Sequence, residues 1–239
     1  MPDHVTANDG LEKWKDGIKA GVKNDRWSKW DIEIQVAVSD YNRHLSRTAG
    51  YQALDWQIIK TIAWVESGGS SADWDKKPMR IGVAGDPGLT ALLSGKEGGE
   101  LILPPAWKTR LTMTSARTNP THNIQAGIGY LLMRAARFEY RDVIDNDARI
   151  FEVTVKAGDS LDKIAHAQRS TVDVLKALNP DVGMLQPGQK LKCQRATHQK
   201  VIVGWRPVNA SMIADRCNAG GDTNYAKKFE YVWAALHEK

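Results

Sequence analysis

The chain has few cysteines and lacks any apolar run long enough to cross a membrane. Its two cysteines, Cys193 and Cys217, allow one disulfide, but no cysteine framework surrounds them, so we expect two free thiols. The spacing typical of metal ligands is also absent, so we expect no metal site. These absences disfavour a disulfide scaffold, a metal-dependent enzyme and a membrane-spanning protein.

The N-terminal region, residues 1–17, lacks the apolar core of a secretory signal. Hydrophobic residues make up 42% of the 239 residues and charged residues 26%, which is typical of a globular chain with one main core and a small module. The formal net charge of +5 suits an acidic polymer, but the lysines and arginines are spread along the chain. No nucleic-acid motif is found, so we expect no nucleic-acid partner.

Residues 55–69 predict a helix whose apolar stripe ends in a carboxylate. Asp55 is suited to cap the start of this helix, and Gly68 with Gly69 to end it. Glu66 takes the next position of a stripe formed by Ile59, Ile62 and Ala63. Apolar neighbours and the negative end of the helix dipole favour the protonated carboxyl, which a general acid needs. The alternative is a partly exposed glutamate in the last helical turn.

Three motifs follow one another along the chain. They are the Glu66-Ser67 pair, the turn at residues 78–82 with Met79 and Ile81, and the segment at residues 123–132 with Asn123, Gly127, Tyr130 and Leu131. Together they resemble the lytic transglycosylase (SLT) branch of the lysozyme-like superfamily. The resemblance implies that Glu66 protonates the glycosidic oxygen between N-acetylmuramic acid and N-acetylglucosamine. It then acts as a base while the muramyl 6-hydroxyl attacks the anomeric carbon, which gives a 1,6-anhydro product without a cofactor.

The same resemblance implies a set of substrate contacts. They come from Ser67, Met79, Arg80, Ile81, Tyr130, Asn218 and Gly220. Arg80 departs from the family, which usually has glutamine at this position, and a guanidinium cannot accept hydrogen bonds. It either pairs with a carboxylate of the substrate's stem peptide or forms an ion pair with Asp73, Asp75 or Asp86.

A second carboxylate near Glu66 would allow hydrolysis instead, because hydrolases of this kind usually use two. Asp86, Glu97 and Glu100 are the candidates in residues 82–105. Asp86 lies in a Gly-Asp-Pro-Gly turn, where an aspartate most often bonds its own backbone. A lysozyme-type muramidase is therefore the alternative enzyme.

Residues 151–193 show the order strand, helix, helix, strand. This segment resembles a LysM module, which would grip the N-acetyl groups of glycan chains. The implied sugar contacts are Gly158, Asp159, Ser160, Asn179, Pro180, Met184 and Leu185. The local alternative is that Asp159 or Ser160 caps a helix and that Asn179 and Pro180 form a plain turn.

The tail at residues 195–239 is too short to form a core of its own. Four of its residues, Asn218, Gly220, Tyr225 and Lys228, resemble the closing motif of the transglycosylase family. Cys217 stands where that family places a tyrosine that reaches toward the substrate, so the loss of a hydroxyl is expected there. We therefore expect the LysM module to be inserted within the catalytic domain.

These expectations give a mostly helical α+β protein. Its predicted parts are a helical arm at residues 1–27, a lysozyme-like catalytic domain at 28–149, the LysM module at 150–194 and a closing catalytic segment at 195–239. Among the nine tryptophans, Trp74 and Trp107 are expected to border the cleft, and the others to pack in the core.

The expected function is cleavage of peptidoglycan, outside the cytoplasm. Without a recognisable signal, such an enzyme would leave by a secretion apparatus or a phage particle, unless the signal had been removed. An antibacterial effector would have a secretion carrier and an immunity protein as partners. The alternatives are a periplasmic wall-remodelling enzyme and an inactive wall-binding protein.

Overall fold

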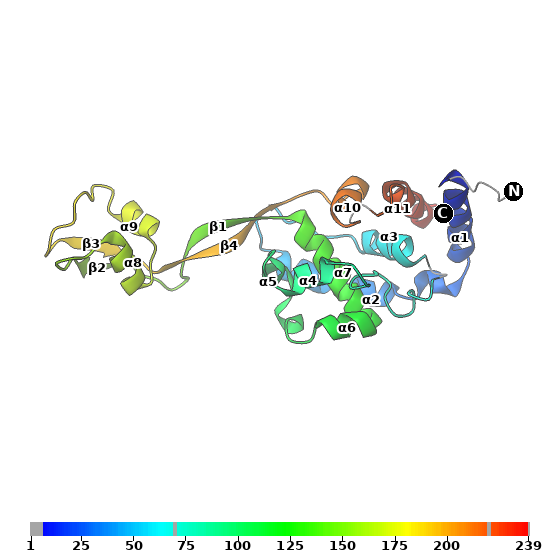
Figure 1. Cartoon of the computed structure of the whole chain (residues 1–239), viewed down its shortest axis with the longest axis horizontal. Helices are drawn as coiled ribbons and strands as arrows, with labels where there is room; N and C mark the ends of the chain where they lie inside the picture. The colour runs from blue at the N-terminus through cyan, green and yellow to red at the C-terminus, as the bar shows by residue number, and fades with distance from the viewer. Residues whose placement is uncertain (1–6, 69–70, 219–220, 239) are drawn as a thin grey trace. The chain divides into compact units, whose positions relative to one another are not determined.

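In the computed structural model, which describes residues 7–68, 71–218 and 221–238, the chain divides into two compact units (Figure 1). The helical unit consists of residues 1–137 and 202–239, and the inserted unit of residues 138–201. Because the first unit is built from two separate stretches of sequence, the second is an insertion in it. The fold is the expected mostly helical α+β class.

The helical unit is formed by short and medium-length helices. They are α1 (Ala7–Val22), η1 (Asp25–Ser28), α2 (Asp31–Leu45), α3 (Trp56–Ser67), α4 (Gly88–Leu93), α5 (Gly99–Ile102), η2 (Pro105–Trp107), α6 (Met113–Thr118), α7 (Pro120–Ala135), α10 (Ala210–Arg216) and α11 (Tyr225–His237). Of the described helices, none is long and apolar enough to cross a membrane.

Helix α3 lies in the core, packed against α2 and α11. Its ends are those expected from the sequence: the Asp55 carboxylate accepts the Gln57 N–H at 2.9 Å, and Gly68 adopts a left-handed conformation with φ 59°. Gly69 lies outside the described residues. Ile59 and Ala63 are fully buried, so the apolar stripe of α3 faces the core as predicted.

Helix α1 packs on the last helix, α11. Leu11 and Ile18 are its buried positions, and the Trp14 ring stands edge-on to Tyr231 with ring centroids 6.1 Å apart. The N-terminal arm is therefore part of the helical unit.

The inserted unit contains the strand, helix, helix, strand order expected from the sequence. Its elements are β2 (Phe151–Thr154), α8 (Leu161–Gln168), α9 (Val172–Leu178) and β3 (Lys190–Cys193). Strands β2 and β3 are antiparallel, with Phe151 opposite Cys193 and Thr154 opposite Lys190. A small core forms between the strands and the helices, from Val155, Ile164, Ala165, Leu175, Leu191 and Cys193.

Two long strands, β1 (Ala136–Ile144) and β4 (Ala196–Trp205), form a second two-stranded sheet that the sequence did not predict. The division into units falls within these strands, after Arg137 and before Ile202. The inserted unit thus includes residues 138–149 and 195–201 in addition to the segment predicted as LysM. A strand signal is present in β1, where Ala136, Phe138 and Tyr140 alternate with charged residues, but most side chains of this strand lie outside a core.

The expectation that Trp74 and Trp107 border the cleft is wrong. Trp74 is 1% exposed and its ring centroid lies 4.7 Å from that of Trp64. Trp107 is 8% exposed and meets Tyr41 edge-on at 4.9 Å. Trp74 lies in a turn and Trp107 ends the short helix η2, but both rings are buried because so large an apolar surface is stabilising in the core.

A chain that ends at Lys200 is expected to lose the helical unit, because it lacks α11, which covers α3 and buries Phe229 and Val232. The helical unit's cooperative thermal transition, followed by circular dichroism, should disappear, while the inserted unit still folds.

The matched control removes the other unit. The Asp145 N–H bonds the Arg195 carbonyl at 3.1 Å, so residues 146–194 are replaced by an Asn-Gly turn. This shortened chain should keep the helical unit's transition. A helical transition that survives loss of the tail would contradict the packing role of α11.

Candidate functional site

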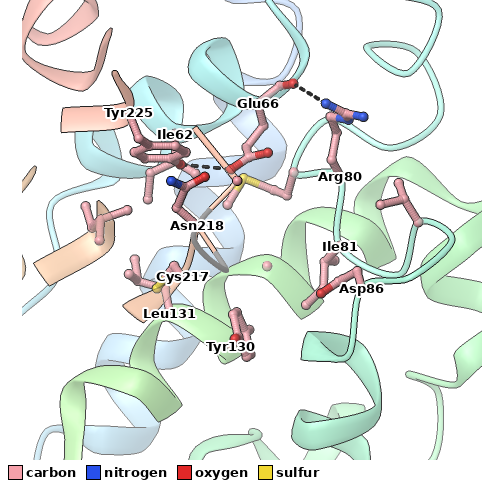
Figure 2. A pocket seen from close by; sticks show the side chains of 15 residues that line it. Ile62, Glu66, Arg80, Ile81, Asp86, Tyr130, Leu131, Cys217, Asn218 and Tyr225 are labelled. Atoms are coloured by element: carbon pink, nitrogen blue, oxygen red, sulfur yellow. Dashed lines mark hydrogen bonds between the residues drawn. The ribbon is translucent and has the colours of Figure 1, made fainter. Parts of the chain in front are cut away.

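A cavity of about 380 Å³ in the helical unit collects residues from four parts of the chain (Figure 2). Its wall comes from α3, from the segment at residues 79–86, from α7, and from the closing stretch that includes α10 and the start of α11. The lining residues are Ile62, Glu66, Met79, Arg80, Ile81, Val83, Asp86, Gly127, Tyr130, Leu131, Ile213, Cys217, Asn218, Gly221 and Tyr225. Residues on both sides of the insertion thus meet at one site.

Glu66 lies in the last turn of α3 and is only partly exposed. The Tyr225 hydroxyl donates a hydrogen bond to Glu66 Oε1 at 2.9 Å, as Figure 2 shows. The pKa of Glu66 is raised, chiefly by burial; the Tyr225 hydrogen bond and the charge of Arg80 oppose this, and the charges of Asp86 and Asp222 add to it. The site therefore favours a protonated carboxyl beside a cavity.

Tyr225 is a candidate functional residue to which the sequence pattern assigned no role. The sequence placed it in the closing motif and predicted the loss of a hydroxyl at Cys217. The structure buries Tyr225 at the first position of α11 and raises its pKa well above the usual value, chiefly through burial. Cys217 lines the same cavity as a free thiol whose pKa burial raises to about 12, so it is neutral at ordinary pH.

The turn at residues 78–82 is held by two buried polar side chains. The Asn123 side chain accepts the Met79 N–H at 3.0 Å and donates to the carbonyls of Ile81 at 3.0 Å and Ala116 at 2.8 Å. Ser67 Oγ lies 2.9 Å from the carbonyl oxygens of both Ala63 and Pro78. Ser67, expected to contact substrate, is 3% exposed, ties α3 to this turn and lines a second cavity next to Glu66.

Helix α7 approaches the turn closely at Gly127. A Cβ atom there would lie 2.6 Å from Met79 Cβ, so only glycine fits without displacing the turn. Met79 and Ile81 are nearly buried, and with Tyr130 and Leu131 they form the apolar part of the cavity wall.

Arg80 has a left-handed backbone with φ 48°, which turns its side chain toward the end of α3. Its Nε lies 3.3 Å from Asp73 Oδ2, and its Nη1 lies 3.5 Å from the Glu66 carbonyl oxygen. Of the three expected ion-pair partners, Asp73 is the one observed, since Asp75 pairs with Lys29 at 2.6 Å. The Arg80 side chain is 46% exposed, so it remains accessible to a ligand.

Asp86 is the only one of the three candidate second carboxylates that lines the cavity with Glu66. Its two oxygens accept the backbone N–H groups of Gly82 at 2.6 Å and Gly88 at 2.8 Å. This is the turn role that the sequence favoured.

The other two candidate carboxylates lie away from this cavity. Glu97 pairs with Arg134 at 3.1 Å, and Glu100 lines a separate cavity with Leu92 and Lys108.

The remaining predicted substrate contacts lie in the closing segment. Asn218 lines the cavity and donates to the Asp222 carbonyl at 2.8 Å. Asp222 in turn pairs with Lys228 at 2.6 Å, which links this loop to α11. Gly220 lies outside the described residues.

The predicted sugar contacts in the first loop of the inserted unit have local hydrogen-bonding roles. Ser160 caps α8 by accepting the Lys163 N–H at 3.2 Å, and Asp159 accepts the Lys156 N–H at 2.7 Å. Gly158 has φ 82°, a conformation that favours glycine.

The second loop of the inserted unit combines anchored and exposed residues. Asn179 bonds both the N–H and the carbonyl of Lys192, at 2.9 and 2.8 Å, so it fixes the loop to β3. Leu185 packs against the small core, whereas Pro180 is exposed and Met184 is 87% exposed. Met184 is therefore free to contact a ligand.

Comparison with known protein families identifies the inserted unit. Residues 153–193 match the family described as LysM domain, as the sequence indicated. Comparison with curated proteins and with solved structures finds no match. The chain thus carries a peptidoglycan-binding module, which indicates binding to peptidoglycan and association with the cell wall.

The substitution Tyr225→Phe should raise the pKa of Glu66 further, because it removes a hydrogen bond that favours the ionised carboxylate. The titration of the Glu66 carboxyl carbon can be followed by NMR and assigned by its loss in Glu66→Gln. Tyr231→Phe, on the same helix, is the control. A Glu66 pKa that stays the same or falls in Tyr225→Phe would contradict the assigned hydrogen bond.

The substitution Asn123→Ala should destabilise the helical unit by about 2–4 kcal/mol, because it leaves buried backbone groups of the turn without partners. Chemical denaturation measures this loss. Asn119→Ala, which removes only the exposed cap of the same helix, should cost about 1 kcal/mol. Equal losses for the two variants would refute the special role of Asn123.

Proposed function

We propose that this protein is a lytic transglycosylase that cleaves the bond between N-acetylmuramic acid and N-acetylglucosamine in peptidoglycan. The observation that carries the proposal is the Glu66 carboxyl, with a raised pKa and a hydrogen bond to Tyr225, at the wall of a cavity. The sequence motifs around Glu66 support the same reaction class, and the LysM domain supports the same polymer.

In the proposed mechanism, protonated Glu66 donates its proton to the glycosidic oxygen as the bond to the anomeric carbon breaks. The Glu66 carboxylate then accepts the proton of the muramyl 6-hydroxyl, whose oxygen bonds the anomeric carbon. Glu66 ends protonated, as it began, and water is not consumed. The Tyr225 hydroxyl holds Glu66 in place and stabilises the carboxylate that forms between the two steps.

Hydrolysis by a muramidase is the second candidate, because Asp86 shares the cavity with Glu66. Both Asp86 oxygens are engaged by backbone N–H groups, which favours a turn role over a nucleophile or a base. The single-carboxylate reaction therefore has the better support.

The cellular setting belongs to the same proposal. We infer an antibacterial effector, delivered by a secretion apparatus or a phage particle and opposed by an immunity protein in the producing cell. The alternative setting is wall remodelling in the periplasm. In either case the LysM domain would hold the enzyme on its substrate and raise the local concentration of glycan strands.

Digestion of purified peptidoglycan, followed by mass spectrometry of the muropeptides, tests the reaction. The wild type should release products with 1,6-anhydro ends, lighter by one water than reducing ends, and Glu66→Gln should release none. Asp86→Asn, which keeps one oxygen acceptor for the turn, should still give anhydro ends.

Reducing ends that require both Glu66 and Asp86 would establish the muramidase instead. Absence of any product, together with retained binding to peptidoglycan, would indicate an inactive wall-binding protein.

A further inference from the structure

A second cavity, of about 490 Å³, shares Glu66, Arg80, Asn218, Gly221 and Tyr225 with the first. Its remaining wall is different in character. In place of Met79, Ile81 and Leu131 it has Trp14 from the N-terminal helix α1, together with Asp222 and Lys228. The space around Glu66 thus continues from a part with several apolar lining residues into a more polar part that Trp14 also lines.

Trp14 is held firmly although it is only partly buried. Its ring lies edge-on to Tyr231, and Lys228 Nζ lies 5.3 Å from its ring centroid. Leu11 and Ile18, one turn away on either side, anchor α1 in the core. In Figure 1, α1 stands beside α11, the helix that begins with Tyr225.

The two cationic side chains that line this second cavity, Lys228 and Arg80, differ in how closely they pair with a carboxylate. Lys228 is paired with Asp222 at 2.6 Å and its side chain is 21% exposed. Arg80 Nε lies 3.3 Å from Asp73 Oδ2, and the Arg80 side chain is 46% exposed. A guanidinium has five N–H donors in a fork that fits a carboxylate, so Arg80 is the group most suited to bind an anion here.

We propose that α1 completes the substrate cleft, and that the second cavity binds the peptide-bearing face of the glycan strand, with Trp14 packing on the stem peptide and Arg80 pairing with one of its carboxylates. This inference rests on the proposed function. In peptidoglycan the carboxylates are carried by peptides attached to the muramyl sugar, which is the sugar whose bond Glu66 would cleave. A carboxylate-bearing substituent therefore has to lie close to Glu66, where the second cavity is.

The first test compares peptide-bearing glycan strands with strands stripped of peptides by an amidase. Wild-type kcat/KM should be higher on the peptide-bearing strands, and Arg80→Gln should reduce this preference about tenfold, as loss of a charge-assisted hydrogen bond does. The Gln side chain is shorter than that of Arg and keeps N–H donors, but it has no charge. Arg43→Gln, an exposed arginine paired with Asp40 outside both cavities, should leave the preference as it is.

The second test measures binding without turnover. In the Glu66→Gln protein, the indole N–H signal of Trp14, assigned by its loss in Trp14→Phe, is followed by NMR. A soluble disaccharide tetrapeptide, N-acetylglucosaminyl-N-acetylmuramyl-tetrapeptide, should shift this signal, and the disaccharide without peptide should shift it far less. The LysM match at residues 153–193 contains no tryptophan, so binding there cannot produce this signal directly.

The two tests distinguish failure of the proposed reaction from failure of peptide binding in the second cavity. If the wild type cleaves neither kind of strand, the proposed reaction fails, and the Trp14 signal alone decides whether the second cavity binds the peptide. A Trp14 signal that responds equally to both disaccharides, or to neither, overturns the inference even if the enzyme is active. An unchanged preference in Arg80→Gln overturns the role of Arg80.

Discussion

The packing of α11 against α3 places Tyr225 against Glu66, and the rest of the site depends on this contact. A carboxylate on the packed side of a core helix is costly, because burial disfavours the charged form. The Tyr225 hydroxyl supplies a hydrogen bond that limits this cost without removing it, so the pKa of Glu66 stays raised. A carboxyl group that is partly buried and has one hydrogen-bond donor is suited to give up and regain a proton.

The other walls of the cavity are fixed relative to Glu66 by buried polar groups. Asn123 and Ser67 bond only backbone atoms around the turn at residues 78–82, so neither needs a ligand to be satisfied. Gly127 lets α7 approach Met79 closely. As a result, Arg80 leaves the turn in a strained left-handed conformation directed toward the end of α3, where the two cavities meet.

The inserted unit shows how one chain can combine the candidate site around Glu66 with a peptidoglycan-binding module. Phe151 and Cys193 are opposite one another in the antiparallel sheet, so the module enters and leaves at neighbouring points. Strand β1 precedes the module in the sequence, strand β4 follows it, and these two strands also pair with each other. The helical unit can therefore be completed by a segment that follows the insertion, and the site draws on residues from both sides of it.

The sequence by itself determined the helix that carries Glu66, with its cap at Asp55 and its end at Gly68. It also determined the order of the LysM strands and helices and the turn role of Asp86, because these features depend on periodicity and on local hydrogen bonds. Only the tertiary structure decided that the Tyr225 hydroxyl bonds Glu66, that Trp74 is buried, and that Trp14 lines a cavity beside Glu66. Each of these depends on contacts between segments far apart in the chain, where burial and packing outweigh what any local pattern encodes.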